Sequence, residues 1–502
     1  MNHTARRVNF RLRMQRLLPI LLAMALLLSA CSSGGNDQEV GQPVTLRVMD
    51  WNETSFNMDY GMLYYAQNPN VEFEIVSTYR LQTAGIDSNE DYEEKYWEFI
   101  QNEKPDILML TQDQYEKYAA DGRLVSLESY VTRDKFDLEG LIPGLVDLLR
   151  EKGGGELYGL APQFYSTAVY YNKDLFDRYN IDYPTDRMSW EELLNLAGRF
   201  PTDGSDEDRI YGLRPGYTTD LYQLGLSIGT TAGLRLVNPA DKRVSIDSES
   251  WEKAFETALT AIRSGTLYKE ENSNFSGAYE DFLLQNPFVR GKVAMAIDGT
   301  YLMQQIREAS DIVPDKAVKN WDLVTIPVNP SNPDYSNDFS ISRIFAINAE
   351  SPNRDAAWDF IRYIHSDEFA RVKSKMSSGQ LPVRTKYIVD EEGRNIAAFY
   401  QLKPSGTNLY AGFEDVPSIF YSQAYMIGQE EMQAVLDDKK TVKEALASMQ
   451  TRLQAALDEA IANPPAKETA SKEEEIRIQF ESRESGAGAD ESASADGEAA
   501  AE

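Results

Sequence analysis

The alternation of strand-like and helix-like segments at the start of the chain is the strongest constraint on its fold. Residues 44–49 (Val-Thr-Leu-Arg-Val-Met) and 71–76 (Val-Glu-Phe-Glu-Ile-Val) are β-branched and alternating, as strands are. A helical stretch separates them, and another helix leads into the apolar segment 107–110. This rhythm predicts an α/β fold with a mostly parallel, doubly wound sheet.

Two later helices have well-marked starts. Ser189-Trp-Glu-Glu192 and Thr441-Val-Lys-Glu444 are capping boxes, in which the first hydroxyl and the last carboxylate bind each other's backbone amides. Apolar residues follow the second box at steps of three or four, at Val442, Leu446, Met449, Leu453, Leu457 and Ile461. One stripe of this last helix is therefore expected to face a core.

The first thirty-one residues have the features of an export signal. Arginines precede an apolar run over residues 17–28, which suits a signal-peptide core and is too short to span a bilayer. The run ends in Leu28-Ser-Ala-Cys31, which resembles the bacterial lipobox. We expect a signal peptide over residues 1–30, an acyl (palmitate) anchor on Cys31 and a flexible tether over residues 31–43. The alternative is an ordinary secretory signal with an incidental cysteine.

Cysteine content and length bound the body of the protein. Cys31 is the only cysteine, so the exported chain has no internal disulfide and must be stabilised by its own core. Roughly 430 residues separate the anchor from the end of the last helix, enough for two domains. Residues 466–502 hold eleven acids and four bases among Ala, Ser and Gly. We expect the tail over residues 464–502 to be disordered.

Charge and residue usage exclude several classes of partner. The net charge is −30, and removal of the five signal arginines leaves about −35, which repels nucleic acid. Only two histidines are present, which excludes a histidine-rich metal site. Gly153-Gly-Gly155 lacks the Lys-Ser/Thr of a phosphate-binding loop. The sequence predicts neither a metal nor a cofactor.

An ordered series of motifs covers the chain from Val44 to about Ala462. Together these motifs resemble the maltose-binding-protein-like solute-binding proteins (family 1) of carbohydrate ABC importers, and the order carries the resemblance. They are Lys104-Pro-Asp-Ile107, Leu157-Tyr-Gly-Leu-Ala-Pro162, Val169-Tyr-Tyr-Asn-Lys-Asp-Leu-Phe176, Gly291-Lys-Val-Ala-Met-Ala-Ile-Asp-Gly299, Phe345-Ala-Ile-Asn348 and Gly379-Gln-Leu-Pro382.

The resemblance implies a type II periplasmic-binding-protein-like fold. Two α/β lobes, each a mostly parallel sheet flanked by helices, would be joined by hinge strands. Lobe 1 would comprise residues 44–155 and 325–463, including late helices that close the cleft, and lobe 2 residues 156–324. The implied function is capture of a sugar or oligosaccharide by hinge closure, without catalysis, and delivery to an ABC permease. The implied state is a monomer anchored on the outer face of the bacterial membrane.

Residue chemistry at strand ends selects the first candidate site residues. A sugar offers flat C–H faces and hydroxyls, so a site needs aromatic rings beside planar polar groups. Trp51 and Asn52 follow the first strand; alternatively, Trp51 caps the core and Asn52 makes a turn. Tyr217 and Tyr222 lie in a segment dense in suitable groups. Asp298 and Tyr301 follow an apolar strand, where Gly299 lets the backbone approach closely.

The resemblance adds further positions. It places ligand contacts on Asp113 and Gln114, although Asp113 is alternatively a helix cap. It also places contacts on Tyr165, which alternatively packs at the hinge, and on Tyr425 and Gln429 of a late helix. It supports Tyr301 as a stacking ring. Leu110 departs from the pattern, since an aromatic residue is expected there, which weakens the case for a malto-oligosaccharide.

Three other functions stay open at the level of sequence, one of which is a purely structural surface lipoprotein or interaction scaffold. The chain could bind a non-sugar solute such as a peptide, or it could be a lipid-anchored glycosidase with two carboxylates at a fixed separation. Eighty acidic residues make a carboxylate pair easy to find, so composition does not reject the enzyme. The ordered resemblance favours the binding protein.

Overall fold

A computed structural model describes residues 44–463 except 83–88, 205–208, 217–219, 239–240, 270–276, 342, 377–378, 391, 406–415 and 418. The predicted signal peptide, the anchor at Cys31, the tether and the tail over residues 464–502 lie outside the described residues, as does Tyr217. Across the described ranges, no helix combines the length and apolarity needed to cross a membrane.

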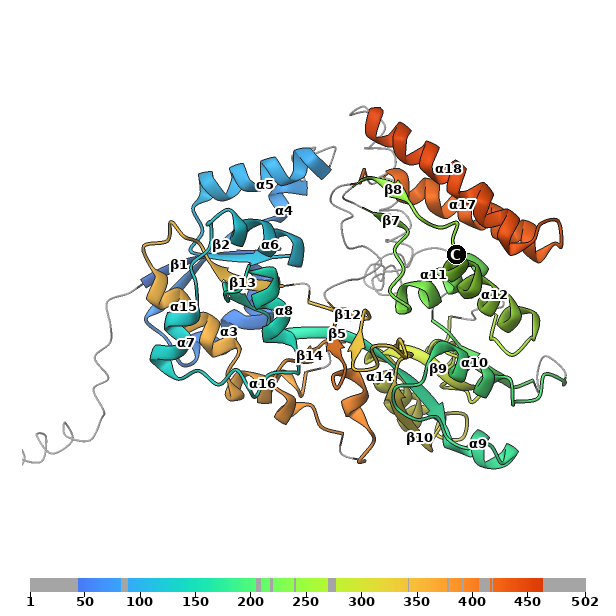
Figure 1. Ribbon diagram of the computed structural model, residues 1–502. Coiled ribbons are helices and arrows are strands. Elements are labelled where there is room, and N and C mark those ends of the chain that lie inside the picture. The colour runs from blue at the N-terminus through green and yellow to red at the C-terminus, as the bar shows by residue number, and fades with distance from the viewer. Residues whose placement is uncertain are drawn as a thin grey trace, which may run out of the picture. The chain divides into compact units, whose positions relative to one another are not determined.

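The first sheet has five strands in the order β2-β1-β3-β13-β4 (Figure 1). β1 and β3 are parallel, whereas β13 is antiparallel to both β3 and β4. β3 and β13 are wholly apolar and almost completely buried, as expected of central strands. The strands are β1 (Val44–Asp50), β2 (Val71–Ser77), β3 (Ile107–Leu110), β4 (Gly159–Leu160) and β13 (Ile344–Ile347).

An aromatic core joins this sheet to its helices. Phe56 contacts Phe73 of β2 and Phe360, and Tyr60 contacts Phe345 of β13 edge to face, with ring centroids 5.0 Å apart. The helices of this part are α2 (Glu53–Phe56), a π-helical segment (Asn57–Gly61), α3 (Met62–Tyr65), α4 (Tyr79–Gln82), α5 (Asn89–Glu103), α6 (Gln112–Ala120), α7 (Glu128–Asp134), α8 (Leu145–Lys152), α15 (Arg354–Ile364) and α16 (Asp367–Lys373).

A small separate unit comprises residues 44–45 and Tyr65–Glu72 of the described chain. Within it, the Val44 amide donates to the carbonyl of Asn70 (3.1 Å), and the Val71 amide donates to that of Asn68 (3.1 Å). These bonds close the turn that leads into β2.

The second sheet is built around the long strand β5, with the order β10-β5-β9-β6 and with β12 and β14 also paired to β5. β5 is antiparallel to β9 and β10, while β6 is parallel to β9. The strands are β5 (Gln163–Asn172), β6 (Tyr211–Arg214), β9 (Val293–Gly299), β10 (Trp321–Thr325), β12 (Phe339–Ser340) and β14 (Leu381–Pro382); short pairs are β7 (Val237–Asn238) with β8 (Arg243–Val244), and β11 (Tyr335–Ser336) with β15 (Lys403–Pro404).

The α/β class is confirmed, but both sheets are mixed, so the prediction of mostly parallel sheets is wrong. A parallel neighbour needs a crossover, usually a helix, to bring the chain back to the same end of the sheet. β5 starts three residues after β4 ends, and β13 follows β12 without a helix. Each of these two connections passes from one sheet to the other, so β5 and β13 enter their sheets without a helical crossover and run antiparallel to their neighbours.

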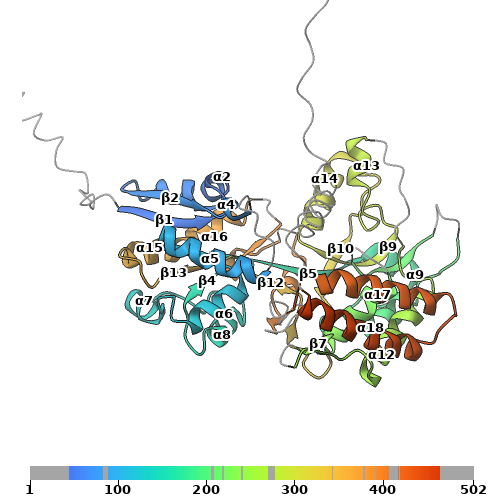
Figure 2. The same cartoon turned by 90° about the horizontal axis from the view of Figure 1, so that it is seen from above.

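Alternate residues of β5 enter two different cores, as the pleat of a strand requires. Ala168 and Tyr170 pack in one core with α13 (Tyr279–Leu283) and α14 (Tyr301–Ile312). Val169 and Tyr171 pack in the other with α9 (Lys173–Tyr179), α10 (Trp190–Ala197), α11 (Leu221–Thr231) and α12 (Glu249–Arg263). Figure 2 shows α13 and α14 on one side of β5 and β9, and α12 on the other.

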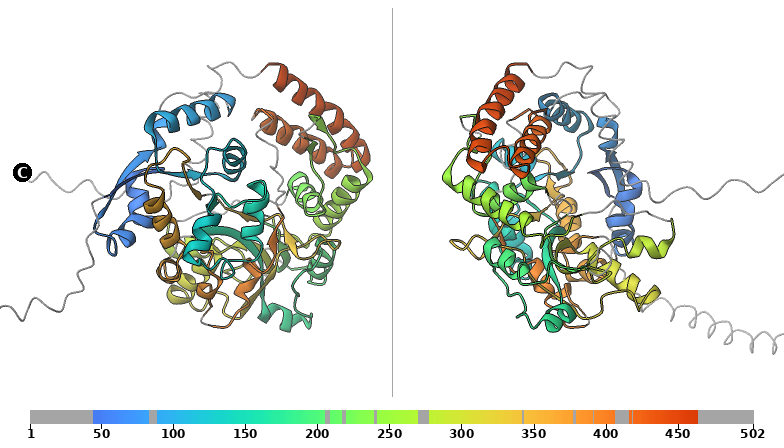
Figure 3. Two further views of the ribbon diagram at one scale, coloured as in Figure 1. Left: turned by 60° about the vertical axis from the view of Figure 1, so that its left-hand side comes forward. Right: turned by 90° about the vertical axis from the view of Figure 1, so that its right-hand side faces the viewer.

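The last two helices, α17 (Ile419–Leu436) and α18 (Val442–Ala462), belong with this second core. They lie side by side (Figure 3), and they contact α11 and α12. Gln450 and Gln454 accept the backbone amides of Ile246 (3.0 Å) and Val244 (2.9 Å). The predicted placement of the late helices in lobe 1 is therefore wrong, because helical periodicity identifies a buried stripe but not the core that buries it. The other lobe boundaries stay a prediction.

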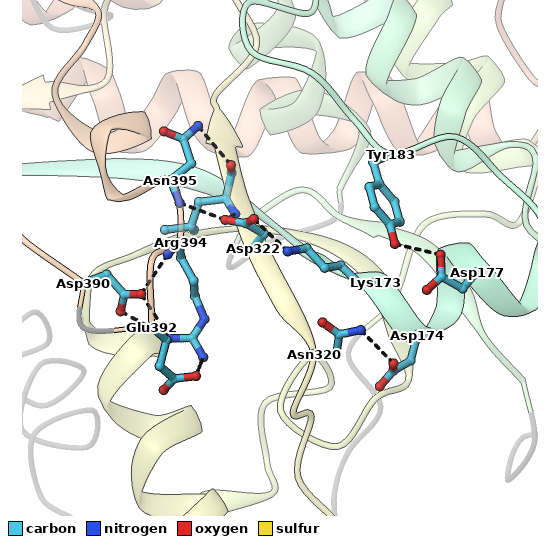
Figure 4. A network of polar contacts seen from close by, with 11 residues as sticks. Lys173, Asp174, Asp177, Tyr183, Asn320, Asp322, Asp390, Glu392, Arg394 and Asn395 are labelled. Carbon is cyan, nitrogen blue, oxygen red and sulfur yellow. Dashed lines mark hydrogen bonds and ion pairs between the residues drawn. The ribbon is translucent and has the colours of Figure 1, made fainter.

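A polar network fixes the segment after β14 to the edge strand β10 (Figure 4). The Asn395 amide donates to Asp322 (2.8 Å), whose other carboxylate oxygen accepts from Lys173 Nζ (2.8 Å). Arg394 lies over the ring of Trp321, 4.0 Å from its centroid. These contacts hold the 3-10 turn Ile396–Phe399 on the core beside β10 and β5; a second such turn is Thr385–Tyr387.

Candidate functional site

The end of β1 presents an exposed aromatic ring on a firmly held backbone. β1 ends at the buried Asp50, and the next residue, Trp51, is 38% exposed. The Trp51 amide donates to Oδ1 of Asp50 (2.6 Å), and Ser77 Oγ donates to the Trp51 carbonyl (2.8 Å). A large apolar ring at a strand end, held by its own backbone bonds, is suited to stack on a flat ligand.

Tyr79 completes this exposed aromatic surface, and it is not among the residues predicted from the sequence. It starts α4, two residues after β2, and its ring stands at 70° to that of Trp51 with centroids 5.4 Å apart. Its side chain is 50% exposed. The signal that could have found it is its position, since β2 neighbours β1 and both strands end at the same edge.

Asp50 lies in a charged cluster with Arg343 and Asp59 at the end of β1. Arg343 lies just before β13 near Asp50, but its Nη1 pairs with Asp59 (2.9 Å), which also accepts from the buried Lys373 (3.2 Å). Burial raises the pKa of Asp50 to about 6; the charge of Arg343 only partly opposes this, and Asp59 adds to it. Oδ2 of Asp50 is buried without a hydrogen-bond partner among the described residues.

The end of β9 repeats the arrangement with different pairing. Asp298 is buried, and its Oδ2 accepts from Arg214 Nη1 (2.8 Å) and from Asn286 Nδ2 (3.4 Å). Tyr301, the first residue of α14, is 47% exposed. Tyr165 of β5 lies against Gly299: a Cβ there would be 2.5 Å from the Tyr165 hydroxyl. Glycine at this position makes room for the phenol ring, so Asp298, Tyr301 and Tyr165 gather at one strand end.

Several other candidates are engaged in local structure. Asn52 caps α2 by accepting from the Ser55 amide (2.9 Å). Thr111 and Gln114 form the capping box of α6, and Gln114 is buried. Asp113 lies exposed in the first turn of that helix. Because the carbonyl oxygen of Gln114 already accepts from the Thr111 amide (3.2 Å), we leave Gln114 out of the proposed site.

The candidates from the helical part differ in exposure. Tyr222 of α11 is buried and stacks on Phe255, with centroids 6.4 Å apart, and Gly428 of α17 leaves the space that its ring fills. Burial raises its pKa above the ordinary value. Tyr425 is 44% exposed and Gln429 half-buried, both on α17. We therefore leave Tyr222 out of the proposed site and keep the other two.

These two strand ends offer recognition chemistry. Each combines an exposed ring with a buried aspartate and neighbouring hydrogen-bonding groups, which is what the faces and hydroxyls of a small polar ligand require. Within the described ranges, no group of three or more acidic, histidine or cysteine side chains is arranged to hold a metal ion.

Comparison with known proteins shows the family to which this chain is similar and two of its relatives. The profile of the family described as "Bacterial extracellular solute-binding protein" matches residues 63–370. A binding protein of Brucella abortus (strain 2308) is 27% identical over 302 residues, covering 58% of this chain and 68% of that protein. A maltooligosaccharide ABC transporter solute-binding lipoprotein of Streptococcus pneumoniae is 24% identical over 298 residues, covering 58% of this chain and 62% of that protein.

Solved structures of low sequence identity share the fold. A sugar transporter from Rhizobium etli in an open conformation aligns with a TM-score of 0.56 and 22% identity, covering 82% of this chain and 99% of that one. The sugar-binding protein MalE from Xanthomonas citri aligns with a TM-score of 0.57 and 17% identity, covering 84% and 100%. The fold is thus the two-lobed α/β fold of such proteins, and the family match over residues 63–370 shows that the chain is a member of the bacterial extracellular solute-binding proteins.

Proposed function

We propose that this protein captures a sugar or oligosaccharide between two lobes and delivers it to an ABC permease. In this proposal the chain acts as a monomer, performs no catalysis and is held on the outer face of the cell membrane by a lipid on Cys31. Ligand contacts from both lobes would shift the population toward a closed form that the permease recognises.

One observation supports a sugar more than any other. Two strands on different sheets, β1 and β9, each end in or next to a buried aspartate that is followed within three residues by an exposed aromatic ring. Rings that pack on C–H faces, beside groups that bind hydroxyls, suit a carbohydrate. The proposed contacts are Trp51, Asn52, Asp113, Tyr165, Asp298, Tyr301, Tyr425 and Gln429.

The relatives lend this proposal further support. The Streptococcus pneumoniae protein is named as a maltooligosaccharide ABC transporter solute-binding lipoprotein, and the two structural neighbours above are named as a sugar transporter and a sugar-binding protein. A lipobox-like Leu28-Ser-Ala-Cys31 precedes the body of this chain. We therefore carry sugar binding and lipid anchoring over to this protein as proposals.

A thermal-shift panel of mono- and oligosaccharides, including uronates, tests the function. A ligand that binds only the native state raises the melting temperature by mass action. We expect at least one sugar to stabilise the protein in a concentration-dependent manner. Stabilisation by peptides alone would instead assign a non-sugar solute.

Incubation with the stabilising oligosaccharide separates a receptor from a glycosidase. A receptor returns the sugar intact, whereas a glycosidase releases new reducing ends. The appearance of such ends at a rate proportional to protein concentration would overturn the non-catalytic part of the proposal.

The anchor is testable independently of the ligand. Cys31→Ser removes the only thiol of the chain, so the protein is expected to leave the membrane fraction and appear in the medium. Retention of this variant in the membrane would show that something other than a lipid on Cys31 holds it.

A further inference from the structure

Trp51 and Tyr79 are coupled through the backbone as well as through their rings. The Tyr79 amide donates to the Trp51 carbonyl (3.3 Å), and the Thr78 amide donates to the Asp50 carbonyl (2.9 Å). Ser77 Oγ adds a third bond across the two strand ends, to the Trp51 carbonyl (2.8 Å). Two exposed rings at 70° to each other are thus fixed as one corner rather than scattered over the surface.

A corner of this kind has a defined use. A flat ring lying on one aromatic face brings its rim against the second, perpendicular ring, so orientation is selected as well as affinity. Single exposed apolar side chains are common on protein surfaces, whereas exposed apolar side chains held together favour a binding surface.

We propose that Tyr79 is a further ligand-binding residue, that it forms with Trp51 a single subsite for one sugar ring, and that the buried Asp50 is the positioning residue of this corner. This inference rests on the proposed function, and it names the residues that set its specificity.

Asp50 acts through the Trp51 backbone. Its Oδ1 accepts the Trp51 amide at 2.6 Å, and a hydrogen bond to a charged acceptor is roughly twice as strong as a neutral one. The groups that face it are Arg343 before β13, and Asp59 and Tyr60 of the π-helical segment, with Lys373 of α16 behind Asp59. Arg343 pairs with Asp59, so Asp50 keeps a buried oxygen without a hydrogen-bond partner among the described residues.

Protonation of Asp50 therefore weakens the bond that holds Trp51. Because burial raises the pKa of Asp50 to about 6, the change falls between pH 5 and 7. Sugar affinity is expected to fall by about threefold from pH 7.5 to pH 5, and Asp50→Asn, which keeps an oxygen acceptor and loses the charge, should flatten this dependence.

The test is a calorimetric titration of each variant with the sugar found by the thermal-shift panel. Tyr79→Ala is expected to weaken binding about tenfold, and Tyr79→Phe by no more than about twofold, since the ring supplies the contact. Tyr183→Ala is the matched control: it removes a 41% exposed tyrosine packed beside α9, and its affinity should stay within about twofold of wild type. Melting temperatures without ligand confirm that each variant is folded.

The outcomes separate this inference from the function on which it rests. Wild-type protein that binds a sugar while Tyr79→Ala binds it equally well would overturn the corner and leave the function standing. Wild-type protein stabilised by no sugar would overturn both. An Asp50→Asn variant that keeps the wild-type pH dependence would remove Asp50 from its positioning role.

Discussion

The ends of β1 and β9 differ in how the charge of a buried aspartate is compensated. Both bury an aspartate that is followed within three residues by an exposed aromatic residue. Asp298 of β9 is paired with Arg214, and both side chains are only 6% exposed, so the charge is neutralised where it is buried. Asp50 of β1 has Arg343 nearby, but Asp59 takes the guanidinium. One strand end is thus held by an ion pair, whereas the other keeps a charge that its surroundings disfavour.

The largest expected effect comes from breaking the β9 pair. Arg214→Met leaves Asp298 as a buried charge without its cation, which typically costs about 3–5 kcal/mol of unfolding free energy. Chemical denaturation at pH 7.5 measures the loss. Arg187→Met, at the exposed pair with Asp334, is the control and should cost less than about 1 kcal/mol.

A second variant separates charge burial from loss of packing. Arg214→Met combined with Asp298→Asn removes both charges, and it should recover a large part of the lost stability. A double variant as unstable as Arg214→Met alone would show that packing of the arginine, rather than the ion pair, stabilises this strand end.

At the end of β1, removal of the Asp50 charge is expected to stabilise the folded protein at neutral pH rather than destabilise it. Its folded pKa of about 6 lies above the value of 3.8 for an unperturbed aspartate, so the folded state holds the proton longer than the unfolded state. Stability from this group is present below about pH 4 and is lost as pH rises through 6. Relative to wild type, Asp50→Asn should gain about 2–3 kcal/mol between pH 4 and pH 7.5.

Urea denaturation of both proteins across this pH range measures the difference. Only the pH-dependent part is predicted, because the asparagine amide adds its own constant cost. A stability difference that stays level from pH 4 to pH 7.5 would mean that the folded pKa of Asp50 lies near the ordinary value of 3.8, so its charge is compensated, and the contrast between the two strand ends would disappear.

Local patterns predicted much of this fold, and long-range partners account for what they missed. The boxes at Ser189 and Thr441 are confirmed as caps of α10 and α18, because every group of a capping box lies within four residues. The stripe of α18 is confirmed as buried, apart from the half-buried Ile461. Its partner core is not encoded in the helix itself, which is why α17 and α18 were placed in the wrong lobe.

The candidate site shows the same division between features that local sequence patterns predict and features that depend on long-range contacts. Trp51, Asn52 and Tyr301 can be proposed from the sequence because each lies within two residues of the end of a strand-like run. Tyr79 was missed, since its relation to Trp51 depends on β2 lying next to β1. Arg343 pairs with Asp59 rather than with Asp50. This ion pair joins residues 284 positions apart, so no local sequence pattern predicts it.

The two rings should contribute comparably to binding if both strand ends contact the ligand. Trp51→Ala and Tyr301→Ala are each expected to weaken sugar binding by more than roughly 1 kcal/mol, measured by calorimetric titration. Met58→Ala, which alters another exposed apolar side chain, is the control and should leave affinity unchanged. Normal affinity in both ring variants would show that the ligand binds at another surface.

The smallest expected effect concerns the fit of Tyr165 at the end of β9. A Cβ on Gly299 would lie 2.5 Å from the Tyr165 hydroxyl and 3.0 Å from two ring carbons, so Gly299→Ala must displace the phenol. The displaced atoms are at the far end of a flexible side chain. The cost in unfolding free energy should therefore be about 1 kcal/mol, the lower end of the range for overpacking.

A double-mutant cycle shows whether that contact is the cause. Tyr165→Ala removes the obstructing ring, so adding Gly299→Ala to it should cost nothing further, and the two changes should be non-additive by about the cost of the glycine change alone. Additive losses would locate the effect of Gly299→Ala in the β9 backbone, where the Gly299 carbonyl accepts from the buried Tyr170 hydroxyl (2.6 Å). In that case the β9 end would be held by its backbone rather than by the fit of its side chains, and its likeness to the Trp51 corner would be limited to the exposed ring.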